Sequence, residues 1–194
     1  MGYVITVEEY IENRLHLSGM LHTVALTEYA ENSYLNLPKL VSSGLADDAR
    51  TVDHSCAALG AFVNDLFSFE KEFIDEGADN NLISVTILNQ PRKTLAEVIH
   101  QVVPLLRRYL AQYFTATTRP CSDTATGASR EPSDSVASFL NSMQAVVQAT
   151  WKWQSNTQRC KRKKSIFRED IGSNTGPSLS ATILEPPLLP LSKT

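Results

Sequence analysis

The stretch from Ser55 to Phe69 constrains the fold of this chain more than any other feature. It reads SCAALGAFVNDLFSF and is apolar or small on nearly all sides. A helix with this pattern needs other elements all around it, because no face of it suits water. Asp47 and Asp48 suit the positive end of such a helix, so we expect one helix over residues 47–73. The chain should therefore fold around a central, buried helix.

Other segments also repeat apolar residues at helical spacing, so the sequence predicts an all-α fold. Thr6 suits the N-cap of the first segment, which is either one long helix or two abutting ones. Residues 81–89 (NLISVTILN) fit a short helix or a strand, and their helical context favours a helix. Pro104 should kink or break the helix that contains it. The predicted helical segments are residues 7–34, 81–89, 94–115 and 135–158.

Composition and charge narrow the class of protein. With 194 residues, 42% of them hydrophobic, and a net charge of -3, the chain resembles an ordinary soluble domain and gives no case for nucleic-acid binding. No apolar run reaches the roughly 20 residues of a membrane span, and the N-terminus lacks a signal-peptide pattern, so we expect a cytoplasmic protein. Its three cysteines have no metal-ligand spacing, and reduced thiols are expected. We predict one domain over residues 1–160 and, because residues 161–194 are rich in Pro and Gly, a disordered tail.

Three oxygen-bearing side chains form a stripe on the central helix. Asn64, Ser68 and Glu72 follow one another at intervals of four residues, so they should stack on one helix face. Amide, hydroxyl and carboxylate oxygens are ligands that Mg²⁺ accepts, with positions left for water and phosphate. Small residues around Gly60 on the same stripe would leave room for an apolar substrate. The alternative is that Asn64 and Ser68 bond neighbouring backbone while Glu72 is solvated near the helix end.

The full string NDLFSFEKE at residues 64–72 resembles the second metal-binding motif of class I terpene synthases, N-D-hydrophobic-x-S-x-x-K-E, especially in fungal sesquiterpene cyclases. The resemblance implies that Asn64, Ser68 and Glu72 hold one of three Mg²⁺ ions and that Lys71 contacts the substrate diphosphate. Asp65 completes the family string but lies off the metal stripe, so we expect it to be structural.

Two more segments are similar to the same family. Residues 153–160 (WQSNTQRC) match a Trp, a Thr four residues later and an Arg, which implies a diphosphate contact for Arg159, with Cys160 in place of the usual Tyr. Residues 9–19 (EYIENRLHLSG) are similar to the family's helix-break segment, which implies that Arg14 senses diphosphate and that Gly19 lies at the break. The alternatives are a solvated Arg14 and an Arg159 that belongs to the basic cluster at residues 159–164.

The resemblance covers about residues 7–160 and corresponds to the C-terminal part of a class I terpene synthase domain, a partial helical bundle. It implies a lyase that ionises a prenyl diphosphate such as farnesyl diphosphate with Mg²⁺ and cyclises the carbocation. The aspartate-rich motif that holds the other two ions in the family is missing, and Asp47 and Asp48 do not substitute for it. Activity of this chain alone therefore stays open, and the alternative is a non-catalytic helical remnant or interaction module. Product skeleton, substrate length and oligomeric state are not encoded in these motifs.

Overall fold

A computed structural model describes residues 4–118 and 134–160 of the chain. Every regular element in these ranges is a helix, which confirms the all-α prediction. The elements are α1 (Val7–Leu17), α2 (Met20–Ala30), α3 (Leu37–Ser42), α4 (Ala46–Phe69), the π-helix η1 (Glu70–Asp75), α5 (Leu82–Asn89), α6 (Leu95–Thr118), α7 (Asp134–Asn156) and the 3-10 helix η4 (Gln158–Cys160).

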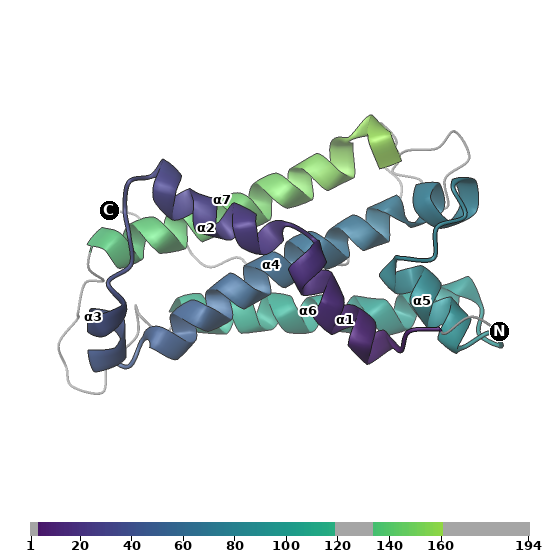
Figure 1. The fold of residues 1–194 in the computed structure, drawn as a ribbon, viewed down its shortest axis with the longest axis horizontal. Helices are drawn as coiled ribbons and strands as arrows, with labels where there is room; N and C mark the ends of the chain where they lie inside the picture. Colours follow the sequence, from purple (N-terminus) through teal and green to yellow (C-terminus); the bar gives the residue numbers. More distant parts are fainter. Residues whose placement is uncertain (1–3, 119–133, 161–194) are drawn as a thin grey trace, which may run out of the picture.

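Helix α4 is the centre of the bundle, as its sequence predicts. It packs against α2, α6 and α7 along its length and contacts α1, α3 and α5 (Figure 1). Ala57, Ala58 and Phe62 are fully buried, and the residues on nearly every side of this helix belong to the core. A helix without a polar face is stable only when it is covered in this way.

The end of α4 differs from the prediction of one continuous helix over residues 47–73. The α-helix stops at Phe69, and Glu70–Asp75 form a wider π-turn. Two features mark this turn: Glu76 N donates to the Lys71 carbonyl at 3.0 Å, and the rings of Phe69 and Phe73 stack with centroids 5.5 Å apart. Because one turn is too short for residue spacing to separate a period of 3.6 from a wider one, the sequence pattern did not show the change.

The first predicted helical segment is two helices with a break at Ser18 and Gly19. Thr6 caps α1 with a reciprocal bond to Glu9, as the sequence predicts for its N-terminus. Gly19 has a φ of +75°, a left-handed conformation that suits glycine and lets α2 start in a new direction. Met20 then packs against Gly60 of α4, where an added Cβ would lie 2.7 Å from the Met20 sulfur. The room expected at Gly60 for a substrate is therefore filled by α2.

The remaining predicted helices are confirmed with small changes of boundary. Residues 82–89 are helical, as their context predicts. The sequence predicts a kink or a break at Pro104, and α6 continues through this residue without a break. In the described part of the chain, no helix combines the length and apolar character that crossing a bilayer requires. The predicted boundary at residue 160 stays a prediction, because residues 161–194 lie outside the described ranges.

The direction of the long helices decides which residues meet at one end of the bundle. Helix α7 runs the same way as α4, since Cys56 lies near Met143 and Asn64 lies near Gln154 (Figure 1). Helix η4 follows α7 directly, contacts α4, and lies at the end of the bundle where α4 ends (Figure 1). The segments that carry Glu72 and Arg159 are thus brought to the same end.

Asp53 provides a test of the packing between α2 and α4. One of its carboxylate oxygens is buried and has no hydrogen-bond partner among the described residues. Burial raises the pKa of Asp53 from 3.8 to about 6, and Glu28 on α2 adds to this shift. Because the folded state then holds this proton more tightly than the unfolded state, the free energy of unfolding should fall as the pH rises from about 4 to about 6.

We expect Asp53→Asn to remove this pH dependence and to exceed the wild type in stability at pH 7 by about 1–3 kcal/mol. Urea unfolding of both proteins between pH 4 and pH 7 would measure the difference. Asp47→Asn, at an exposed position, is the control and should leave the pH profile of stability unchanged. Parallel pH profiles for wild type and Asp53→Asn would contradict the assignment.

Candidate metal and diphosphate site

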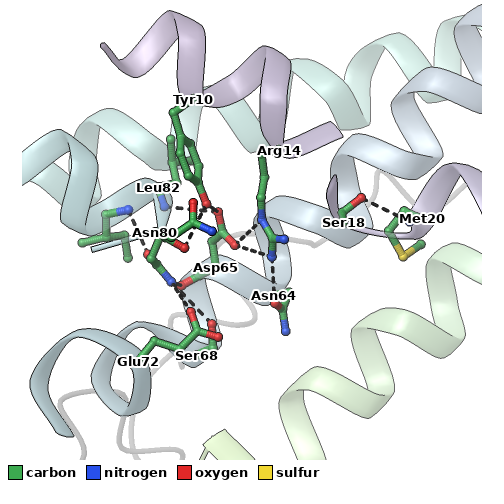
Figure 2. A network of polar contacts seen from close by, with 12 residues as sticks. Tyr10, Arg14, Ser18, Met20, Asn64, Asp65, Ser68, Glu72, Asn80 and Leu82 are labelled. Atoms are coloured by element: carbon green, nitrogen blue, oxygen red, sulfur yellow. Dashed lines mark hydrogen bonds and ion pairs between the residues drawn. The ribbon is translucent and has the colours of Figure 1, made fainter. Parts of the chain in front are cut away.

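A buried carboxylate on α4 joins helix α1 to the centre of the bundle. Asp65 is fully buried, and its two oxygens accept from separate donors on α1 (Figure 2). The Tyr10 hydroxyl donates to Oδ2 at 2.7 Å, whereas Arg14 Nη2 and Nε lie 2.7 and 2.8 Å from Oδ1. The backbone N–H of Leu82 adds a bond at 3.1 Å to Oδ2. This one side chain therefore ties together α1, α4 and the start of α5.

The charges of this cluster depend on one another. Burial raises the pKa of Asp65, while the Arg14 guanidinium, the Tyr10 hydroxyl and the Leu82 amide act in the opposite direction. Burial also disfavours the charged form of Arg14, but the facing Asp65 carboxylate outweighs it and raises the pKa of that guanidinium. Arg14 is therefore cationic and held by Asp65, which contradicts the alternative of a merely solvated helix arginine.

Ser68 and Glu72 both contact the side chain of Asn81, a residue that was not predicted from the sequence as part of the site. The Asn81 amide nitrogen lies 3.1 Å from Glu72 Oε2 and 3.4 Å from Ser68 Oγ, and it donates to the Asp65 carbonyl at 2.8 Å. Its own oxygen caps α5 by accepting from Ile83 N at 3.0 Å. Figure 2 shows Ser68 and Glu72 on the same side of the cluster. One buried amide thus holds two of the three predicted metal ligands together.

Asn64 lies one turn before Ser68 and has different partners. Its Oδ1 accepts from Arg14 Nη2 at 3.0 Å, and its Nδ2 lies 3.3 Å from Oε1 of Gln154 on α7. It is half-buried and sits beside Arg14 in Figure 2. The alternative in which Asn64 bonds neighbouring backbone does not fit these side-chain contacts. Burial of its amide, however, is no reason for a metal, because protein groups already satisfy it.

Lys71 and Arg159 lie at the same end of the bundle as Glu72. Lys71 Nζ pairs with the Glu76 carboxylate at 2.9 Å, and Arg159 is exposed on η4. The buried Cys160 thiol is close enough to both cations for their charges to affect its pKa. Burial raises the pKa of its thiol, Arg159 and Lys71 lower it, and Glu72 raises it. The charges of Arg159, Lys71 and Glu72 therefore all affect the same thiol, which indicates that the three side chains lie in one region.

The chemistry of this donor set fits a hard divalent cation. An amide oxygen, a hydroxyl and a carboxylate are donor types that Mg²⁺ accepts, and cationic side chains beside them suit an anionic ligand. Without a bound ion, Asn64 Oδ1 faces Arg14, whereas Ser68 and Glu72 face Asn81. Among the described residues, no group of three His, Cys, Asp or Glu side chains is placed to hold a metal. A zinc-type cluster is thus not found in that part of the chain, and any cation here would depend on the Asn, Ser and Glu oxygens.

Comparison with known families assigns the chain to a family by its sequence alone. Residues 1–112 match the model described as terpene synthase family 2, C-terminal metal binding. The chain belongs to this terpene synthase family. The match includes Arg14, Asn64, Ser68, Lys71 and Glu72, and it ends before α7. No curated protein matches the chain.

Membership of this terpene synthase family shows a metal-binding region but does not test which side chains bind the metal. The predicted roles of Asn64, Ser68 and Glu72 therefore stay predictions, as do those of Arg14 and Lys71. Arg159 lies outside the matched residues, so its role depends on its position in the fold alone. Tyr10 and Asn81 were not predicted from the sequence as site residues, although Asn81 before an apolar helical run carries a recognisable N-cap signal.

The link between Arg14 and Asp65 can be tested by removing one partner. Arg14→Ala should lower the free energy of unfolding by about 3 kcal/mol or more, because it leaves a buried carboxylate without its cation. The double variant with Asp65→Asn should recover part of this loss. Arg50→Ala removes an exposed pair of the same chemistry, at 2.8 Å from Asp47, and should cost less than about 1 kcal/mol. Equal costs for Arg14→Ala and Arg50→Ala in urea unfolding would contradict the buried link.

Asn81 can be tested against another N-cap asparagine. Asn81→Ala removes both a helix cap and a buried donor, so we expect it to lower the free energy of unfolding by about 2–4 kcal/mol. Asn36 caps α3 through a bond of 3.0 Å from Lys39 N and is exposed, so Asn36→Ala should cost only about 1 kcal/mol. Chemical denaturation of the two variants would measure the difference, and equal losses would show that the bridging contacts of Asn81 add nothing to its cap.

Proposed function

We propose that this chain carries the Mg²⁺ and diphosphate site of a terpene synthase of the sesquiterpene cyclase type. Asn64, Ser68 and Glu72 would hold one Mg²⁺ ion. Lys71, Arg14 and Arg159 would contact the diphosphate of a prenyl substrate such as farnesyl diphosphate. The activity is a carbon–oxygen lyase reaction, in which diphosphate leaves and the remaining carbocation cyclises.

One observation supports this function most. The Asn81 amide lies between Ser68 and Glu72, and Arg14 lies against Asn64, so all three predicted ligands belong to one connected cluster. A cation bound there would meet a guanidinium from α1 within the same cluster. The arrangement suits an ion and an anion that bind together rather than a cation alone.

Each side chain has a definable task in binding and orienting the substrate. A guanidinium binds two phosphate oxygens at once, whereas Lys71 acts as a point charge that must leave Glu76 to reach a ligand. Together they would orient diphosphate at the end of α4 and stabilise its negative charge as the carbon–oxygen bond breaks. When bound, Mg²⁺ supplies further charge stabilisation for the same leaving group.

A second candidate function is diphosphate binding without turnover, as in a non-catalytic helical module. The absence of a further acidic cluster among the described residues favours it, because ionising an allylic diphosphate requires the stabilisation of several negative charges. Incubation with farnesyl diphosphate and Mg²⁺ separates the two candidates. Released diphosphate and a hydrocarbon product would support the lyase, and tight binding without product would support the non-catalytic module.

The metal site itself is tested by Glu72→Gln. Wild type should bind pyrophosphate with Mg²⁺ and unfold at a higher temperature in their presence. Glu72→Gln keeps the size of the side chain but removes its charge, so we expect at least about a tenfold loss of affinity for the Mg²⁺–pyrophosphate pair. Isothermal titration calorimetry would measure this affinity.

Glu12→Gln is the matched control, because Glu12 is exposed on α1 and should leave the affinity unchanged. An affinity that stays the same in Glu72→Gln, or falls equally in both variants, would count against the proposed ligands. Folding of each variant is checked by its unfolding temperature without ligand.

A further inference from the structure

A hollow lies between α4 and α6, toward the other end of the bundle from Glu72. Its volume is about 490 Å³, within the range of small-molecule sites. Every side chain that lines the hollow can donate a hydrogen bond, and none of the lining side chains is a carboxylate. Besides Tyr109, the lining side chains are Arg50, Thr51, His54 and Ser55 from α4 and Arg108 and Gln112 from α6.

Ser55 gives an independent sign that a ligand belongs here. Its hydroxyl oxygen is fully buried and has no hydrogen-bond partner among the described residues. A buried hydroxyl without a partner costs free energy, and buried polar groups are rarely left this way. Ser55 is one of the residues that line the hollow, so this unsatisfied hydroxyl lies beside that space.

The two arginines are placed to reach the same space from opposite helices. The Arg108 guanidinium lies 5.5 Å from the centre of the Tyr109 ring, and the His54 ring lies 5.9 Å from the same ring. Tyr109 is buried, so it is a fixed platform for both side chains. Arg50 pairs with Asp47 at 2.8 Å, but both side chains are exposed, and such pairs are weak enough to exchange for a better partner.

We propose that this hollow binds the phosphate group of a small, soluble phosphorylated molecule. Guanidinium groups bind phosphate oxygens in pairs, and the hydroxyl, imidazole and amide donors would satisfy the remaining ones. The volume exceeds what a single phosphate fills, so the hollow has space for the organic part of the ligand. Ser55 lies thirteen residues before Ser68 on α4, about 20 Å along the helix axis, so this site is separate from the proposed metal site.

The experiment measures binding of phenyl phosphate and inorganic phosphate to the full chain by calorimetry in EDTA, so that no metal-dependent site contributes. We expect saturable binding of both, with phenyl phosphate binding more tightly. Arg108→Gln should weaken it by about tenfold, because it removes a charged donor. Ser55→Ala should weaken it by about threefold and should raise the unfolding temperature without ligand, because an unsatisfied buried hydroxyl is gone.

Two controls separate this site from general charge and from the metal site. Arg107→Gln changes the neighbouring arginine, which does not line the hollow, and should leave the affinity unchanged. Glu72→Gln should also bind phosphate in EDTA like wild type, so failure of the metal site and failure of this site are distinguishable. No saturable binding by wild type, equal losses in Arg107→Gln and Arg108→Gln, or binding only to phosphatidic acid vesicles would each overturn the proposal.

Discussion

The buried carboxylate of Asp65 is the interaction on which the arrangement of this end of the bundle depends. A charged group with no exposure to water is tolerated only where donors surround it, and here they are Tyr10 and Arg14 from α1 and the Leu82 N–H from α5. Because those donors lie 51 to 55 residues before it and 17 residues after it, satisfying one side chain fixes three segments. The position of Arg14 beside Asn64 follows from this constraint.

The need to satisfy the buried Asp65 carboxylate also positions residues of the proposed Mg²⁺ and diphosphate site. Asn81 is held at the start of α5, next to Leu82, whose backbone donates to Asp65, and from there its amide reaches Ser68 and Glu72. A site for Mg²⁺ and diphosphate would thus share its support with the packing of α1. We expect changes at Asp65 or Asn81 to affect stability and ligand affinity together.

Several features were predictable from the sequence because they depend on local pattern. The central helix followed from an apolar run with no polar face, and the N-terminus of α1 from Thr6 and Glu9. The break at Gly19 was implied by the family resemblance, because the local pattern left one long helix or two abutting ones open. The candidate ligands Asn64, Ser68 and Glu72 followed from spacing and from the family string that the comparison supports at the level of the family. The π-turn after Phe69 was not predictable, because a single wide turn leaves no periodic signal. The role of Asn81 was not predictable either, because its contacts join residues 9 to 16 positions apart across a turn.

By itself, the sequence determined the all-α class, the central position of α4 and membership of a metal-binding terpene synthase family, since each depends on residues close together in the chain. Only the tertiary structure decided what surrounds the candidate ligands: Arg14 bound to Asp65, Met20 in the space before Gly60, and Arg159 at the end of the bundle that holds Glu72. These contacts arise from the relative directions of helices and from the need to satisfy a buried charge. Neither is written in the spacing of residues along one helix.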